Sequence, residues 1–173
     1  LGMVPDTRSQ LLIEMESLSH EMPSLEDRGK ILSASMRERT PIIYARTTYK
    51  SVAMIWKIKI NENAKTPAFW NFFPELNHNE MVGFTNPQAD FIPIILFDRD
   101  AHEQMKKRFV VTKDILEKRG VCCEVVDMGE GSVFTKTFRA IFLGDFASYH
   151  LALRYGVDPT PVDMVEELKK MLA

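Results

Sequence analysis

Two short segments of the sequence gather side chains that can move protons. They are 61–65 (Asn-Glu-Asn-Ala-Lys) and 74–80 (Pro-Glu-Leu-Asn-His-Asn-Glu), with the aromatic segment 69–73 between them. Aromatic neighbours remove water from a carboxylate or an imidazole and move its pKa toward neutrality, where general acid–base catalysis is most effective. The pattern indicates proton-transfer chemistry, although a capped turn with solvated charges above an aromatic core explains the same residues.

The second segment also contains residue types that bind metal ions. Glu75, His78 and Glu80 supply two carboxylates and one imidazole. A second histidine at helical spacing or a Cys-x-x-Cys pair, which strong zinc sites contain, is missing from the sequence. A metal hydrolase built on these three residues is therefore an alternative that would require bound metal and be inhibited by chelators.

Two further segments have the composition of phosphate-binding loops. Segment 129–132 (Gly-Glu-Gly-Ser) lies between a predicted strand and a predicted helix, so its amides can face an anion at a helix N-terminus. Glu130 would repel that anion, and a plain turn with Ser132 as N-cap is the simpler interpretation. Segment 46–48 (Arg-Thr-Thr) follows the first predicted strand at the edge where α/β sheets bind ligands, although an ordinary loop explains it equally well.

Several segments of the chain resemble the signature of one enzyme family. The bifunctional phosphoglucose/phosphomannose isomerases have similar residues at positions 61–65, 67–69, 73–80, 143–149 (Leu-Gly-Asp-Phe-Ala-Ser-Tyr) and 156–162 (Gly-Val-Asp-Pro-Thr-Pro-Val). The resemblance covers nearly the whole chain from Thr40 onward. The run Glu-Leu-Asn-His-Asn-Glu in this context is far more specific than a single glycine motif.

This resemblance implies an activity and roles for three residues. Family members interconvert glucose 6-phosphate or mannose 6-phosphate with fructose 6-phosphate, in glycolysis and gluconeogenesis, without a metal or organic cofactor. The resemblance implies that Glu62 is the base that moves a proton between C2 and C1 through a cis-enediol. It also implies that His78, contributed by the partner subunit of a homodimer, assists ring opening. Lys169, on the C-terminal helix, would approach the substrate oxygens.

The resemblance also implies a division of the protein into subdomains. Family enzymes have two sugar isomerase (SIS) subdomains, and the upstream one holds the Ser/Thr-rich loop that binds the sugar phosphate. We expect residues 1–39 to form helices that link from a missing upstream subdomain, and residues 40–173 to form the C-terminal SIS subdomain. A family threonine on the last helix falls at Val162 here, with Thr160 nearby. A second hypothesis is a non-catalytic phosphosugar-binding or assembly module with the same fold.

The elements that must position these residues follow from hydrophobic periodicity and from helix-breaking residues. The pattern predicts strands over 40–45, 91–97 and 121–127. It predicts helices over 11–22, 24–37, 51–65 and 132–155. Two further helices are predicted, one from Asp98 or Asp100 to Gly120 and one from the N-cap Thr160 to residue 172. Pro23-Ser24 is expected to separate the first two helices, both of them surface elements. Strands that are apolar on both faces and alternate with helices predict one α/β domain, a three-layer αβα sandwich with a mostly parallel sheet. The family resemblance implies that this sandwich is of the flavodoxin-like SIS type.

Composition excludes several classes of protein. The 22 basic and 24 acidic residues give a net charge of −2, so there is no basic field for a nucleic-acid partner. No apolar run reaches the roughly 18 residues of a membrane span, and no signal-peptide core is present, so we expect no membrane partner and a cytoplasmic location. The two adjacent cysteines, Cys122 and Cys123, rule out a disulfide framework. An open apolar face on so short a sheet predicts a dimer or a larger assembly.

Overall fold

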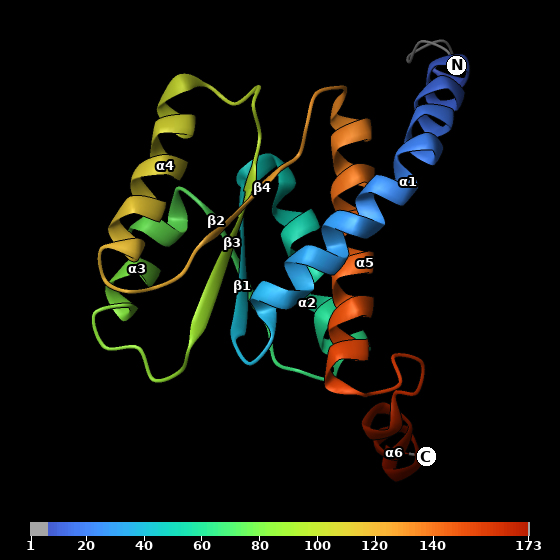
Figure 1. The fold of residues 1–173 in the computed structure, drawn as a ribbon, viewed down its shortest axis with the longest axis vertical. Helices are drawn as coiled ribbons and strands as arrows, with labels where there is room; N and C mark the ends of the chain where they lie inside the picture. Colours follow the sequence, from blue (N-terminus) through green and yellow to red (C-terminus); the bar gives the residue numbers. More distant parts are fainter. Residues whose placement is uncertain (1–6, 173) are drawn as a thin grey trace.

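Four short strands form one parallel sheet at the centre of the computed structural model, which describes residues 7–172 (Figure 1). The strands are β1 (Thr40–Arg46), β2 (Phe69–Phe73), β3 (Phe91–Phe97) and β4 (Glu124–Asp127), in the order β2-β1-β3-β4. Every neighbouring pair is parallel. The predicted mostly parallel sheet is confirmed.

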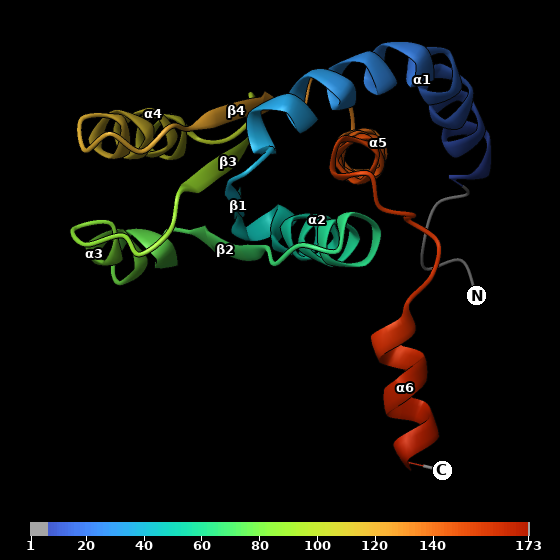
Figure 2. The ribbon, with the colours of Figure 1, turned by 60° about the horizontal axis from the view of Figure 1, so that its bottom comes forward.

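The two faces of the sheet have separate cores because side chains alternate along each strand. On β1, Ile43 and Ala45 face one core, and Ile42 and Tyr44 face the other. The first core is covered by α1 (Arg8–Met36), α2 (Lys50–Ala64) and α5 (Val133–Tyr155), and the second by α3 (Glu80–Gly83) and α4 (Glu103–Glu117). Figure 2 shows these helix layers on opposite sides of the sheet. The three-layer αβα architecture is therefore confirmed.

Strand β2 lies where the sequence pattern predicted none. Within residues 7–172 it pairs only with β1, from Ile42 opposite Phe69 to Arg46 opposite Phe73, so it forms an edge of the sheet. Of its five residues only Phe73 is fully buried, and Phe69 is exposed. A partly exposed edge strand lacks the continuous apolar run that identifies a central strand. The predicted strand over 121–127 is also shorter than expected, because pairing begins at Glu124.

The predicted break at Pro23-Ser24 is wrong, because α1 continues through Pro23. Leu18, Leu25 and Leu32 recur every seven residues along α1, and all three are buried on the side of the helix that packs along α5. A proline inside a helix costs about 3 kcal/mol. Each buried leucine contributes about 1.5–3 kcal/mol, so packing against α5 outweighs the break. Residues 8–36 are thus part of the packed structure, and a domain boundary at residue 40 stays a prediction.

Two helices begin later than predicted. His102, not Asp98 or Asp100, is the N-cap of α4, and its Nδ1 accepts a hydrogen bond from the Gln104 amide at 3.3 Å. Asp98 is fully buried and has other partners, described below. The last helix, α6 (Asp163–Leu172), begins three residues after the predicted N-cap Thr160 and extends away from the sheet beyond the end of α5 (Figure 1). Within residues 7–172 no helix has the length and apolarity to cross a bilayer.

Candidate active site

Glu62 lies in the last turn of α2, at the edge of the sheet where the strands begin. The helix ends at Ala64, and Lys65 takes a left-handed conformation (φ 55°) that turns the chain toward β2. Asn61 Oδ1 accepts a hydrogen bond from the Ala68 amide at 2.9 Å and closes this turn. The Glu62 carboxylate is exposed, and no residue of 7–172 gives it a hydrogen bond or an ion pair, so both oxygens are free to accept a proton.

A cavity of about 580 Å³ lies against Glu62. Its first wall is the end of α2 and the following loop, and its second wall is the start of α6, with the lining residues Asn61, Glu62, Lys65, Thr66, Pro67, Pro161, Val162, Asp163, Met164 and Val165. A cavity of this volume is within the range that holds small metabolites. Val162 and the turn residues around Glu62 therefore line one site, although about 100 residues separate them in the sequence.

The segments that carried the family resemblance meet around this turn. Asn63 Nδ2 donates to Ser148 Oγ at 2.9 Å, and Lys59 Nζ lies 3.2 Å from Asp145 Oδ1, so two side chains of α2 are tied to segment 143–149 on α5. Lys65 Nζ donates to the carbonyl of Pro161, in segment 156–162, at 2.5 Å. These three contacts hold the last turn of α2, and with it Glu62, in a defined place.

His78 lies on the opposite edge of the sheet. It follows a short 3-10 helix, η2 (Glu75–Asn77), which begins two residues after β2 ends. Since Glu62 precedes β2 and His78 follows it, the five residues of β2 separate them by roughly 17 Å along the strand. His78 is exposed and lines another cavity, of about 310 Å³, together with Arg108 of α4. One chain therefore does not bring Glu62 and His78 together.

Lys169 is the third residue to which the resemblance gave a role. It is exposed on α6, and its Nζ lies 2.6 Å from Glu166 Oε1. It does not line the cavity beside Glu62. It lies one helical turn beyond Val165, which does, and residues four apart share one face of a helix.

The metal-site alternative finds no support in the described part of the chain. Residues 7–172 contain no group of three or more His, Cys, Asp or Glu side chains arranged to hold a metal ion. The Glu80 carboxylate instead accepts hydrogen bonds from Tyr44 Oη at 2.6 Å and from Asn71 Nδ2 at 2.5 Å. Burial, followed by the charge of Glu80, raises the pKa of Tyr44, so the phenol stays protonated and remains a donor. Glu80 thus links β1 to β2.

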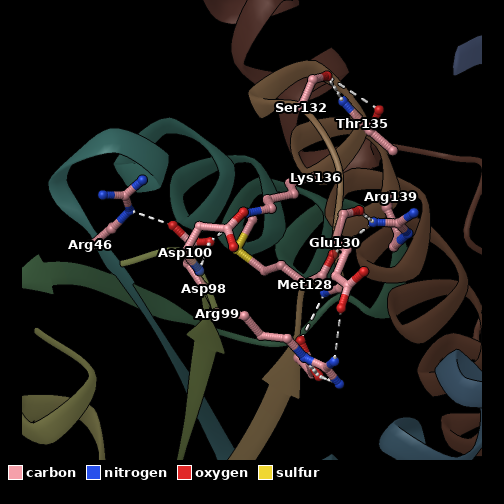
Figure 3. Close-up of polar contacts among 12 residues, drawn as sticks. Arg46, Asp98, Arg99, Asp100, Met128, Glu130, Ser132, Thr135, Lys136 and Arg139 are labelled. Atoms are coloured by element: carbon pink, nitrogen blue, oxygen red, sulfur yellow. Dashed lines mark hydrogen bonds and ion pairs between the residues drawn. The ribbon is translucent and has the colours of Figure 1, made fainter. Parts of the chain in front are cut away.

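The loop Arg-Thr-Thr at 46–48 lies where the strand order reverses, between β1 and β3, the usual ligand crevice of such sheets. Here the crevice is filled by a network of ion pairs (Figure 3). The fully buried Asp98 lies 2.8 Å from Arg46 Nε and 2.8 Å from Lys136 Nζ, and Asp100 also binds Lys136. Burial acts to lower the pKa of Lys136, but its hydrogen bonds to Asp100 and Asp98 outweigh this effect and raise it. Both cations are therefore already paired with carboxylates.

The side-chain hydroxyls at the loop 129–132 are also already hydrogen-bonded. Ser132 Oγ accepts a hydrogen bond from the Thr135 amide at 3.1 Å, which confirms Ser132 as the N-cap of α5. Ser132 Oγ and Thr135 Oγ1 donate to the carboxylate of Glu14, on α1, at 2.5 and 2.6 Å. These hydrogen bonds lower the pKa of Glu14. A carboxylate of the chain itself thus occupies the position that an anion would take, and the plain-turn interpretation is supported.

Comparison with known proteins identifies the class of fold and then the family. The structure superposes on a glucose-6-phosphate isomerase like protein from Thermus thermophilus with a TM-score of 0.66 and 21% identity, over 82% of this chain and 46% of that one. The class is therefore an α/β fold with a parallel sheet. The family described as "Bacterial phospho-glucose isomerase C-terminal SIS domain" matches residues 25–172, and the chain belongs to it.

Two curated relatives carry the name "Bifunctional phosphoglucose/phosphomannose isomerase". The protein from Aquifex aeolicus is 34% identical, in an alignment that covers 99% of this chain and 54% of the relative. The protein from Caldicellulosiruptor bescii is 37% identical, in an alignment that covers 100% of this chain and 54% of the relative. The family resemblance drawn from the sequence motifs is confirmed, and the chain spans about half the length of these relatives.

Proposed function

We propose that this chain is the catalytic C-terminal half of a phosphoglucose/phosphomannose isomerase. The reaction interconverts glucose 6-phosphate, and mannose 6-phosphate, with fructose 6-phosphate. The observation that carries the proposal is a free carboxylate, Glu62, beside a cavity in a chain that belongs to this family. The names of the two curated relatives give the substrate class.

The chemistry follows from the position of Glu62. In the opened sugar the carbonyl at C1 makes the hydrogen on C2 acidic, and Glu62 removes it as a proton to give a cis-enediol. Return of this proton to C1, together with transfer of the O2 hydroxyl proton to O1, gives the ketose, so atoms and charge balance without a metal or an organic cofactor. The negative charge that develops on the oxygens needs a nearby donor. Lys169 is suited to this role, since it follows Val165 on the helix that forms the second wall of the cavity.

The proposed role of His78 calls for a second copy of the chain. Its separation from Glu62 across β2 and its place at a different cavity support a homodimer in which each site combines Glu62 of one subunit with His78 of the other. An apolar groove between α1 and α5, lined by Met15, Leu18, Met22, Phe134, Phe138 and Phe142, is further evidence of unpartnered surface.

Phosphate binding is assigned to the upstream SIS subdomain. Two loops at the carboxyl edge of this sheet have the composition of phosphate-binding loops, and each is paired with a carboxylate of the chain itself. Glu14 binds at the loop 129–132, and Asp98 binds at the loop 46–48. The relatives are about twice as long as this chain, which leaves room for a second subdomain of similar size.

Glu62→Gln in the protein at its natural length tests the proposal. It removes the base without changing the shape of the side chain, and we expect conversion of fructose 6-phosphate to glucose 6-phosphate to fall at least about a thousandfold. Glu167→Gln, the same change at an exposed residue of α6, is the control and should keep full turnover. Full turnover by Glu62→Gln would disprove the assignment.

Deuterium exchange separates the isomerase from the non-catalytic alternative. The unmodified protein should incorporate deuterium at C2 of glucose 6-phosphate in deuterated water, because a proton held by Glu62 exchanges with solvent. Binding of the sugar phosphate without any such incorporation would support the non-catalytic binding module instead.

A further inference from the structure

The second wall of the cavity beside Glu62 is not held in place by burial. All ten residues of α6 are exposed, including Met164 at 84% and Leu168 at 55% of their surface. The helix follows the loop 156–162, which leaves the end of α5. Something other than a packed core must therefore hold the start of α6 against the end of α2.

Lys65 makes the contacts that can do this. Its Nζ donates to the carbonyl oxygens of Pro161 at 2.5 Å, of Pro159 at 3.2 Å and of Glu62. An ammonium group has three N–H donors, so these three carbonyls use all of them. One of the carbonyls belongs to the last turn of α2 and two belong to the loop before α6. Lys65 thus joins the two walls of the cavity through a single side chain.

Lys65 occupies a backbone position at which glycine is the usual residue. Lys65 ends α2 in the left-handed region, with φ 55°. Glycine takes this conformation without steric cost and is the commonest residue there, whereas a residue with a Cβ is disfavoured. Glycine would satisfy the backbone better but would leave the three carbonyls without their donor. Conformation and side-chain contacts can therefore be separated by substitution.

We infer that Lys65 is a positioning residue, which holds the start of α6 over Glu62 and so sets the placement of Lys169 relative to the Glu62 carboxylate. Its effect on turnover rests on the proposed function. Its effect on the position of α6 does not, since that follows from the three hydrogen bonds alone.

The position of α6 can be measured without any assay of activity. In the protein at its natural length, with Cys122 and Cys123 replaced by serine, spin labels at Met54 on α2 and Met171 on α6 report the distance between the two helices. Labelled protein is diluted into unlabelled protein so that only distances within one chain contribute. We expect one narrow distribution of label-to-label distances when Lys65 is present, and a broad distribution for both Lys65→Met and Lys65→Gly.

Lys57→Met is the matched control, because Lys57 is on the same helix but makes no hydrogen bond or ion pair with the loop 156–162 among the described residues. It should leave the distribution narrow. Lys65→Gly should unfold at the same denaturant concentration as the unmodified protein or a higher one, because glycine suits the backbone. A narrow distribution for Lys65→Gly, or an equally broad one for Lys57→Met, would overturn the inference.

Kinetics then test the link to catalysis. Both Lys65 variants should lower kcat about tenfold or more while KM for the sugar phosphate changes little, since misplacement affects the reacting groups more than phosphate binding. A broad distribution with an unchanged kcat would show that Lys65 orders α6 without positioning the site. Failure of the proposed function would give a different result. Glu62→Gln would keep full turnover, and the Lys65 variants would still show the broad distribution of distances.

Discussion

The indole of Trp56, on α2, lies directly against the backbone of Gly144, on α5. A methyl group added at Gly144 would lie 2.5 Å from Trp56 Nε1, closer than atoms can approach. The same nitrogen donates a hydrogen bond to the Ala140 carbonyl at 2.7 Å, so the indole cannot move away freely. This contact fixes how closely α2 approaches α5, and Glu62 lies six residues further along α2.

Gly144→Ala should therefore destabilise the fold, by about 1–3 kcal/mol, because the side chain overpacks a buried contact. Chemical denaturation measures the free energy of unfolding. Gly83→Ala is the control, since nothing lies within 4 Å of the added methyl group. Equal stability of the Gly144→Ala and Gly83→Ala proteins would contradict the close packing of α2 on α5.

Removal of the Lys136 side-chain charge should lower the free energy of unfolding, because the buried carboxylate of Asp98 then has one partner fewer. The Asp98 side chain is fully buried, and the Lys136 side chain is 3% exposed. Loss of one partner from such a pair costs about 3–5 kcal/mol, so Lys136→Met should lower the denaturation midpoint strongly. The double variant Lys136→Met/Asp98→Leu removes the stranded carboxylate as well. It should be less destabilised than the sum of its single variants, and strict additivity would argue against the pair.

The free energy of unfolding should decrease in acid, because protonation of Glu21 on α1 removes its ion pair with Arg139 on α5. Two hydrogen bonds from Arg139 to Glu21, at 2.6 and 2.8 Å, hold the pKa of Glu21 below its ordinary value of 4.5. Glu21 therefore binds a proton more readily in the unfolded chain. The contribution of the Glu21 carboxylate to the free energy of unfolding is complete above pH 4.5. It is lost as the pH falls through the lower pKa that Glu21 has in the folded protein.

Unfolding free energies measured between pH 7 and pH 3 check this contribution. Glu21→Gln should show a smaller loss of stability below pH 5 than the unmodified protein. The difference should be less than about 1 kcal/mol because the pair is partly exposed to solvent. Glu16→Gln, a change at an exposed carboxylate of the same helix, should follow the unmodified curve. Identical pH dependence of the two variants would contradict the role of the Arg139–Glu21 pair.

Mixed dimers test whether His78 acts across subunits. At natural length, Glu62→Gln and His78→Ala should each be nearly inactive alone. After joint refolding in equal amounts, half of the dimers are hybrids with one native site, so about a quarter of full activity should return. No recovery, with hybrids verified by mass spectrometry, would place His78 in the same subunit as Glu62 or outside the site.

The central part of the fold follows from local sequence patterns. Strands β1 and β3 are apolar on both faces, and α2 and α5 have clear termini, so these elements were predicted within a few residues. Strand β2 could not be found in this way because an edge strand is buried on one side only. The continuity of α1 through Pro23 was also missed, although its leucines at seven-residue spacing indicate one packed stripe.

The types of residue at the candidate site, and their match to a known family, were determined by the sequence alone. The family resemblance pointed to Glu62, His78 and Lys169, and their roles remain predictions. Only the tertiary structure separates Glu62 from His78 across β2 and brings the start of α6 beside Glu62 through Lys65. It also pairs Arg46 and Lys136 with buried carboxylates. The physical reason is that spacing along the chain specifies local conformation, whereas distances between remote segments depend on how helices pack on the sheet.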